Sequence, residues 1–218
     1  MLPAAWGQVT VQLSFFAYIG MLLPQLLYNL RRKSVHGLSW LMHFILFCGC
    51  ICDAGYGLGR LMPWQYYSIT IFNIFVLSIQ HFQFYIYSRR ALPRFYFAAT
   101  IFLSFLLICV AASLRNKATN QDIFLGFGYI GTTAWLLNSL PQITVNWRLQ
   151  STAGLSFLFV VIGLLAMLCD TVSAYSLGWG LPNKIGGPIS ASCQAVLLFQ
   201  FWRYRKRSVA PAGELTST

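Results

Sequence analysis

Seven apolar segments follow one another along the chain, and short polar stretches that carry most of the charges separate them. A helix needs about 20 apolar residues to cross the hydrocarbon core of a bilayer, and each segment has about that length. The pattern therefore predicts an all-α membrane protein with seven transmembrane helices. The predicted segments are residues 6–29, 38–59, 65–88, 95–114, 122–146, 155–177 and 185–203.

One stretch of this pattern occurs twice, with an offset of 117 residues. Residues 23–53 align with residues 140–170 without a gap, and 13 of these 31 positions are identical. Each copy contains Leu-Pro-Gln, then an asparagine and a basic residue, and then Gly-Leu-Ser. A duplication of this extent indicates that the architecture consists of two related halves.

The two copies begin in the first and fifth segments, four crossings apart, so they run in the same direction through the membrane. The fourth segment restores that direction and is predicted to be a linker helix. Two parallel three-helix repeats joined in this way are typical of transporters that bind substrate between the repeats. The expected divisions are residues 1–90 for the first repeat, 91–118 for the linker helix, 119–207 for the second repeat and 208–218 for a disordered cytoplasmic tail.

Composition supports a membrane protein, and the placement of charge predicts its orientation. Hydrophobic residues make up 57% of the chain and charged residues 9%, against about 25% charged in soluble domains. The net charge of +11 does not indicate a nucleic-acid partner, because the basic residues lie at the ends of apolar segments. Eleven of the 15 lysines and arginines follow odd-numbered segments. Positive charge favours the cytoplasm, so we expect a cytoplasmic C-terminus and a lumenal N-terminus.

Motifs of enzymes and metalloproteins do not occur in the sequence. It contains no glycine-rich phosphate loop, no nucleophile elbow and no zinc-ligand spacing. Cys48, Cys50 and Cys52 lie two residues apart within an apolar segment. On a helix each would point about 200° from the next, so they cannot converge on one metal ion. We expect no enzymatic activity, no cofactor and no metal.

Each Leu-Pro-Gln places a proline inside an apolar helix. Proline removes one backbone donor and leaves a carbonyl one turn earlier without its partner, and in lipid that carbonyl must be satisfied by protein or water. The amides of Gln25 and Gln142 lie beside Pro24 and Pro141 and are able to do so. One interpretation is a fixed kink, and the other, favoured by the duplication, is a pair of hinges.

These motifs carry a resemblance to a known family. Pro-Gln followed by asparagine, basic residues, serine and Gly-Leu-Ser, at residues 23–39 and 140–156 of a seven-segment chain, resembles the PQ-loop family. That family includes cystinosin, lysosomal cationic amino-acid exporters and, more distantly, SWEET sugar transporters and the KDEL receptor. The resemblance implies proton-coupled export of small solutes from an acidic organelle, at a lysosomal or vacuolar membrane, by rocking of the two repeats about the prolines.

The chain departs from the cystinosin-like pattern at most positions that the resemblance assigns to the solute. Gly163 stands where that pattern has an acidic residue, and Gln194 stands where the last helix has another. Asn138 replaces a basic residue, whereas Lys184 is retained. The resemblance therefore does not extend to cystine as the solute.

Apart from Asp122 at the first position of the fifth segment, Asp53 and Asp170 are the only acidic residues inside the apolar segments, and they occupy equivalent positions in the two copies. A carboxylate within the membrane is costly, which makes it a functional candidate. We expect both to be proton-coupling sites, Asp170 ahead of Asp53, with His43 as a further candidate. The alternative for the aspartates is a position near the non-cytoplasmic helix ends, where they would cap helices or face water. The alternative for His43 is satisfied packing.

Other polar residues of the segments are candidates for binding the solute. Amides in membrane helices also serve as contacts between helices, and a lysine near a helix end can extend to the interface. The predicted solute-binding residues are Asn73, Asn138, Lys184, Gln194, Tyr56 and Tyr175.

The sequence therefore favours a secondary transporter that moves a small polar solute, an amino acid or a derivative, by alternating access. Its expected partners are that solute, protons and the lipid bilayer. The alternatives are a non-transporting PQ-loop protein, either a cargo receptor or a lipid scramblase, and a sugar uniporter. A receptor would need a basic lumenal pocket, and a scramblase would need a polar groove open to lipid.

Overall fold

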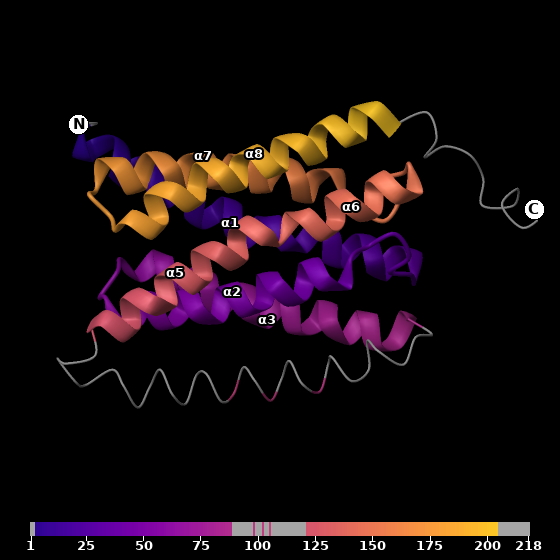
Figure 1. The fold of residues 1–218 in the computed structure, drawn as a ribbon, viewed down its shortest axis with the longest axis horizontal. Helices are drawn as coiled ribbons and strands as arrows, with labels where there is room; N and C mark the ends of the chain where they lie inside the picture. Colours follow the sequence, from indigo (N-terminus) through magenta and orange to yellow (C-terminus); the bar gives the residue numbers. More distant parts are fainter. Residues whose placement is uncertain (1–2, 89–97, 99–101, 103–104, 106–120, 205–218) are drawn as a thin grey trace, which may run out of the picture.

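A computed structural model describes residues 3–88, 98, 102, 105 and 121–204 (Figure 1). The predicted linker helix at residues 91–118 and the predicted tail at residues 208–218 lie outside these residues, apart from three positions of the linker. Between its loops the described chain is helical. The helices are α1 (Ala4–Arg32), α2 (Trp40–Gly59), α3 (Trp64–Tyr87), α5 (Gln121–Leu137), α6 (Ser139–Leu149), α7 (Phe157–Ser176) and α8 (Leu181–Tyr204).

Among the described residues, five helical stretches are long and apolar enough to cross a membrane. Four of them are α1, α2, α3 and α7, and the fifth is Asp122–Leu149, which combines α5 and α6. The chain is therefore an integral membrane protein built from helices. The seven-span count and the linker remain predictions.

The duplication extends well beyond the identical residues. At a displacement of 117 residues, α2 has the same bounds as α7 and α3 has the same bounds as α8, and α1 matches the combined range of α5 and α6. The helix ends also match, because Lys33 and Gln150 both adopt the left-handed conformation, with φ of 48° and 49°. Ser39 and Ser156 both cap the following helix with their side chains. An ungapped match from residue 4 to residue 87 indicates two copies of one fold.

The two repeats pack through equivalent helix pairs. Within each repeat, the third helix contacts the other helices, since α3 packs on α1 and α2, and α8 packs on α5, α6 and α7. Between the repeats, α1 packs along α7 and α2 packs along α5. Buried apolar side chains from both repeats, including Leu22, Leu77 and Phe159, form one shared core. The repeats therefore interlock across a common interface.

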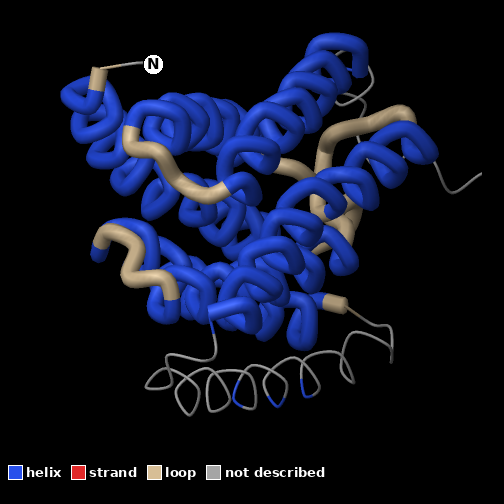
Figure 2. The backbone as a smooth tube through the Cα atoms, turned by 60° about the vertical axis from the view of Figure 1, so that its left-hand side comes forward, coloured by secondary structure: helices blue, strands red, loops and turns tan. Residues whose placement is uncertain are grey.

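The loops of the described chain gather at two ends of the bundle (Figure 2). Residues 33–39 and 150–156 lie at one end, which we call the Gly-Leu-Ser end. Residues 60–63 and 177–180 lie at the other, which we call the opposite end. The two loops of the Gly-Leu-Ser end touch, because a Cβ placed on Gly37 would lie 3.1 Å from the Gly154 Cα. That end is closed by contact between the repeats.

The two prolines have different effects on their helices. The helix of the second repeat is interrupted at Asn138, three residues before Pro141, whereas α1 continues through Pro24. Pro141 has no N–H for the Leu137 carbonyl, so the helical bond between them is missing. The same bond is missing in α1, but the helix there remains continuous. An interruption at the proline is thus seen in the second repeat alone among the described helices.

Candidate functional site

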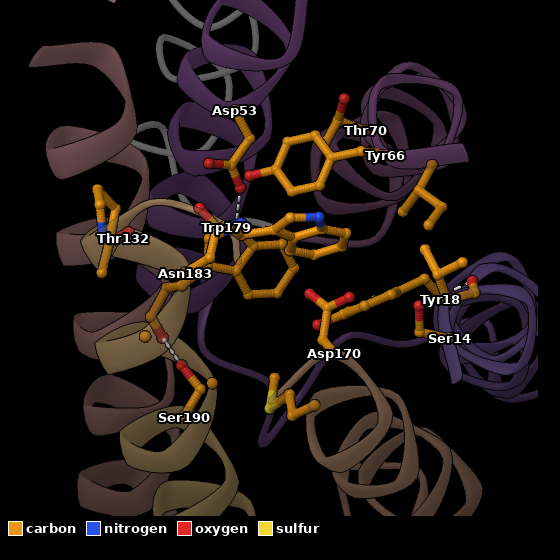
Figure 3. Close-up of a pocket in the computed structure, with 17 residues that line it drawn as sticks. Ser14, Tyr18, Asp53, Tyr66, Thr70, Thr132, Asp170, Trp179, Asn183 and Ser190 are labelled. Atoms are coloured by element: carbon orange, nitrogen blue, oxygen red, sulfur yellow. Dashed lines mark hydrogen bonds between the residues drawn. The ribbon is translucent and has the colours of Figure 1, made fainter. Parts of the chain in front are cut away.

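A cavity of about 70 Å³ lies between the two repeats (Figure 3). Trp179, Pro182 and Asn183 line it, so it is displaced towards the opposite end of the bundle. Asp53 and Asp170 both face it, one from each repeat. The structure therefore brings the two intramembrane acids to one site.

Equivalent positions of the two repeats line this cavity. Ten of its lining residues form five pairs at the offset of 117 residues. The pairs are Asp53 with Asp170, Tyr18 with Trp135, Tyr66 with Asn183, Ile69 with Gly186, and Thr70 with Gly187. Such a wall arises when a cavity straddles the axis that relates two repeats.

Each carboxylate meets an aromatic donor from the other repeat. Trp135 Nε1 donates to Asp53 Oδ2. The Tyr18 hydroxyl of α1 lies beside the Asp170 carboxylate of α7 (Figure 3). Trp135 and Tyr18 are equivalent residues, so the two pairs are related by the duplication. Asp53 is buried, with 6% of its surface exposed, whereas Asp170 is half-buried.

Aromatic rings form much of the rest of the wall. The Tyr18 and Trp135 rings lie edge to face with their centroids 5.9 Å apart, and those of Tyr66 and Trp179 do so at 5.8 Å. This arrangement is favourable for aromatic pairs. None of the described residues that line the cavity is a lysine, an arginine or a histidine. The wall is therefore acidic and aromatic.

Glycine makes room for Asp53. A Cβ on Gly131 of α5 would collide with the Asp53 carboxylate. Any other residue at this position would displace either Asp53 or α5. The close approach of α2 and α5 therefore depends on Gly131, which is the equivalent of Ser14 in α1.

A second polar feature, at the Gly-Leu-Ser end, holds the two repeats together. Gln25 Nε2 donates to the Gly154 carbonyl at 3.2 Å, and Gln25 Oε1 accepts from Ser156 N at 2.7 Å. Gln142 does the same in return, donating to the Gly37 carbonyl at 3.0 Å and accepting from Ser39 N at 2.8 Å. Each glutamine thus binds the Gly-Leu-Ser backbone of the other repeat. We call these four bonds the clasp.

The clasp continues into each repeat through a chain of amides. Gln25 Nε2 also donates to Asn29 Oδ1 at 2.8 Å, and Asn29 Nδ2 donates to Gln83 Oε1 at 3.0 Å. Gln83 Nε2 ends the chain on the Leu26 carbonyl at 3.0 Å. The second repeat has the same bonds, through Gln142, Asn146, Gln200 and Ile143. Buried networks that are fully satisfied in this way fix the geometry of a packed region.

Comparison with known proteins agrees with the division of the chain into two repeats. The model of the PQ loop repeat matches residues 7–66 and 123–182, one match in each half. The chain belongs to the PQ-loop repeat family. The resemblance inferred from the two Pro-Gln motifs is thereby confirmed.

Two known proteins are similar to parts or to the whole of this PQ-loop protein. Cystinosin of Bos taurus is 40% identical over 52 residues, which cover 24% of this chain and 14% of cystinosin. The solved structure of a eukaryotic SWEET transporter matches with a TM-score of 0.62 and 14% identity, over 89% of this chain and 98% of that one. The first likeness is confined to a small part of cystinosin, and the second shows a shared fold. The expectation that the chain is not an enzyme agrees with both.

None of the six predicted solute-binding residues lines the cavity of the PQ-loop protein. The Asn138 amide donates to the Trp135 carbonyl at 2.8 Å. Tyr56 is buried, with its ring centroid 6.1 Å from that of Tyr66. Tyr175 is 52% exposed, and its hydroxyl donates to the Lys184 carbonyl at 3.4 Å.

The remaining candidates lie within the helical core. Asn73 is fully buried, and its side-chain atoms have no hydrogen-bond partner among the described residues. It is the equivalent of Ser190, which does line the cavity. Gln194 is buried beside Gly163. His43 is buried between α2 and α3, where its ring packs on Phe84 at 5.3 Å, away from the cavity.

Sequence reasoning missed the aromatic wall of the PQ-loop protein. Tyr18, Tyr66, Trp135 and Trp179 had no role in the sequence-based hypothesis. The duplication contained a signal for two of them, because Tyr18 and Trp135 are equivalent positions that both carry an aromatic donor. Their pairing with the aspartates depends on how the repeats dock, which no local pattern reveals.

Proposed function

We propose that this PQ-loop protein is a secondary transporter that moves a small polar solute by alternating access. The solute occupies the cavity between the repeats. The main support is the wall of that cavity, where equivalent residues of the two repeats face one another, with Asp53 and Asp170 as the central pair. Solute sites at the repeat interface are typical of transporters with internal repeats.

The clasp serves as the gate at the Gly-Leu-Ser end. Each of its four hydrogen bonds contributes about 0.5–1.5 kcal/mol net, so the set contributes roughly 2–6 kcal/mol. Solute binding supplies free energy on this scale, since micromolar affinity corresponds to about 8 kcal/mol. Pro24 and Pro141 adjoin the two clasp glutamines. Movement at these prolines would separate the loops and open the cavity to that side.

Proton coupling is part of the proposal, and Asp170 is its first site. Asp170 is half-buried and faces the cavity, whereas Asp53 is buried and held by Trp135. Both carboxylates face the cavity, and the more exposed of them can meet both the solute and water. Asp53 is the second site, and His43 would act only by a route that does not pass through the cavity.

We further propose a lysosomal or vacuolar membrane, with a lumenal N-terminus and a cytoplasmic C-terminus. The family resemblance supports the compartment. The distribution of basic residues supports the orientation, because Arg31, Arg32, Lys33 and Arg148 lie at the Gly-Leu-Ser end. In this orientation the cavity lies in the lumenal half of the bundle.

A reversible cross-link tests alternating access. His36 and Ala153 are equivalent residues that adjoin the touching glycines Gly37 and Gly154. In a background without native cysteines, His36→Cys/Ala153→Cys is joined with a cleavable bis-thiol reagent and reconstituted into liposomes. Solute exchange should stop when the link forms and return when it is cleaved. Each single cysteine variant is the control, and full exchange through the cross-linked protein would rule out a gate at this end.

A further inference from the structure

We infer that the cavity accepts an organic ammonium ion that carries no carboxylate, such as a small amine or amino alcohol. This inference rests on the proposed transport function and names the solute class of the same site. The sequence favours an amino acid, which carries an ammonium group and a carboxylate. The inferred solute carries the ammonium group alone. Three features of the wall carry it: its charge, its aromatic rings and its size.

The charge of the wall favours a cation. Asp53 and Asp170 face the cavity from opposite repeats. Among the described lining residues there is no basic group to neutralise either carboxylate. A positive group placed between them interacts favourably with both in a medium of low dielectric. An acidic solute would instead add a third carboxylate to the site.

The same charge argument separates an amine from an amino acid. The carboxylate of an amino acid needs a basic partner or several donors when it leaves water. Lys184 adjoins the lining residue Asn183 in α8 but does not itself line the cavity. The ammonium group of an amino acid would be stabilised here, whereas its carboxylate would face two like charges.

The aromatic rings suit an ammonium group. Tyr18, Tyr66, Trp135 and Trp179 all border the cavity. A cation over an aromatic face gains about 0.5–2 kcal/mol, more where water is excluded, and aromatic walls are a common means of binding quaternary ammonium groups. Thr70, Asn183 and Ser190 add neutral polar groups, which are suitable partners for a hydroxyl on the solute.

The size of the cavity limits the solute. Its volume of about 70 Å³ is below the roughly 150 Å³ of a protein cavity that holds benzene. In this conformation it excludes a hexose and the larger amino acids. A solute of a few heavy atoms, such as ethanolamine, is the best match, whereas choline is larger than benzene and fits only after the cavity widens.

Matched solutes test the inference directly. Choline, glycine betaine and 3,3-dimethylbutanol share one shape and differ in charge: the first is a cation, the second adds a carboxylate and the third is neutral. Ethanolamine and glycine form a smaller pair. In proteoliposomes loaded with unlabelled ethanolamine, labelled ethanolamine should accumulate at least tenfold above protein-free liposomes. As competitors of labelled ethanolamine uptake, glycine should be at least tenfold weaker than unlabelled ethanolamine, and betaine at least tenfold weaker than choline. Dimethylbutanol should not raise the melting temperature of the protein.

Two variants link this flux to the cavity. Asp170→Asn should reduce amine counterflow at least tenfold, and Asp170→Glu should retain part of it because the charge remains. Asp122→Asn is the matched control, since Asp122 is exposed and does not line the cavity. Melting curves of all three proteins verify that they are folded.

The outcomes separate this inference from the proposed function. If amino acids are exchanged and amines are not, the inference is wrong and the transport function stands. Equal flux of ethanolamine and glycine would also overturn it. If the folded protein exchanges no amine, amino acid or sugar, both the inference and the transport function fail.

Discussion

Asp53 and Asp170 sit in corresponding places, yet the aromatic donors that the other repeat places beside them differ. Trp135 donates to Asp53, whereas Tyr18 stands at the equivalent place beside Asp170. Indole nitrogen is only a donor, but a phenol both donates and accepts. Asp53 is therefore fixed by its partner, while the Tyr18 hydroxyl can also accept from a protonated Asp170 or from a solute. This difference is the residue-level basis for assigning the mobile proton or cation to Asp170.

The first prediction concerns the Trp135–Asp53 bond. Trp135→Phe keeps most of the ring but removes the donor, which leaves a buried carboxylate with one partner fewer. Hydrogen bonds to charged groups contribute about 1.5–3 kcal/mol, so we expect a loss of stability of that order. Thermal unfolding in detergent measures it. Trp147→Phe is the control, because Trp147 is 65% exposed, and an equal loss in both variants would contradict the prediction.

A second prediction concerns a polar side chain that lies away from the cavity. His81 is 5% exposed, its Nδ1 lies 2.8 Å from the Leu77 carbonyl of its own helix, and its Nε2 has no hydrogen-bond partner among the described residues. The second repeat has Leu198 at the equivalent position. Replacing an unpaired buried polar group by an apolar one of similar shape is often neutral or stabilising. His81→Leu should therefore keep or raise the melting temperature and leave exchange unchanged. Loss of exchange in the folded variant would indicate a functional role for His81.

At the scale of the elements, the clasp explains why Gln follows Pro in both copies. Its glutamines serve the backbone of the other repeat rather than the carbonyl that the proline leaves unbonded. The sequence favours that local carbonyl as their partner, whereas in the structure they bond to the backbone of the other repeat and to Asn29 and Asn146. The position of each glutamine next to a proline within an apolar segment predicts that its amide lies on a helix, and both amides do. Their partners lie more than 100 residues away and depend on the docking of the repeats.

The third prediction is that the two halves of the clasp contribute equally. Gln25→Leu removes the partners of the Ser156 N–H, the Gly154 carbonyl and Asn29 Oδ1. Gln142→Leu does the same to the Ser39 N–H, the Gly37 carbonyl and Asn146 Oδ1. Each unsatisfied buried group costs about 1–3 kcal/mol, so each variant should lose roughly 3–9 kcal/mol of stability in this conformation. Melting temperature measures the loss, and Gln12→Leu at an exposed position of α1 is the control. Strongly unequal losses would show that only one half of the clasp is important.

The fourth prediction follows from the unequal effects of the prolines. Pro141→Ala supplies an N–H for the Leu137 carbonyl and should join α5 and α6 into one straight helix. Pro24→Ala changes a helix that is already continuous. Both variants should fold and exchange solute more slowly, with the larger effect in Pro141→Ala. Unchanged exchange in both would reduce the prolines to structural features.

At the scale of the whole molecule, the duplication accounts for what could be predicted. The offset of 117 residues was visible from the Leu-Pro-Gln motifs, and it gave the two repeats and the equivalence of Asp53 with Asp170. The cavity could not be derived in the same way. Asn73 and Gln194 were chosen because they are polar and lie mid-helix, but such positions can face a neighbouring helix as well as a cavity. Only the packing of α1 on α7 and α2 on α5 decides between these two directions.

The last prediction concerns the orientation of the whole molecule. Arg31, Arg32 and Lys33 lie at the Gly-Leu-Ser end, whereas the opposite end carries Arg60 and Lys184 among the described residues. Positive charge is retained on the cytoplasmic side, so the clasp should face the cytoplasm and the cavity should lie in the lumenal half.

Cysteines placed at two exposed loop positions measure this orientation. His36→Cys at the Gly-Leu-Ser end should react with a membrane-impermeant maleimide only from the cytoplasmic side. Leu61→Cys, at a position that is 83% exposed at the opposite end, should react only from the other side. The cysteine-free parent is the control for background labelling. The reverse pattern would show that the protein has the opposite orientation. The cavity would then lie in the cytoplasmic half of the bundle, and the clasp would face the lumen. Labelling of both positions from both sides would instead show that the chain inserts in two orientations.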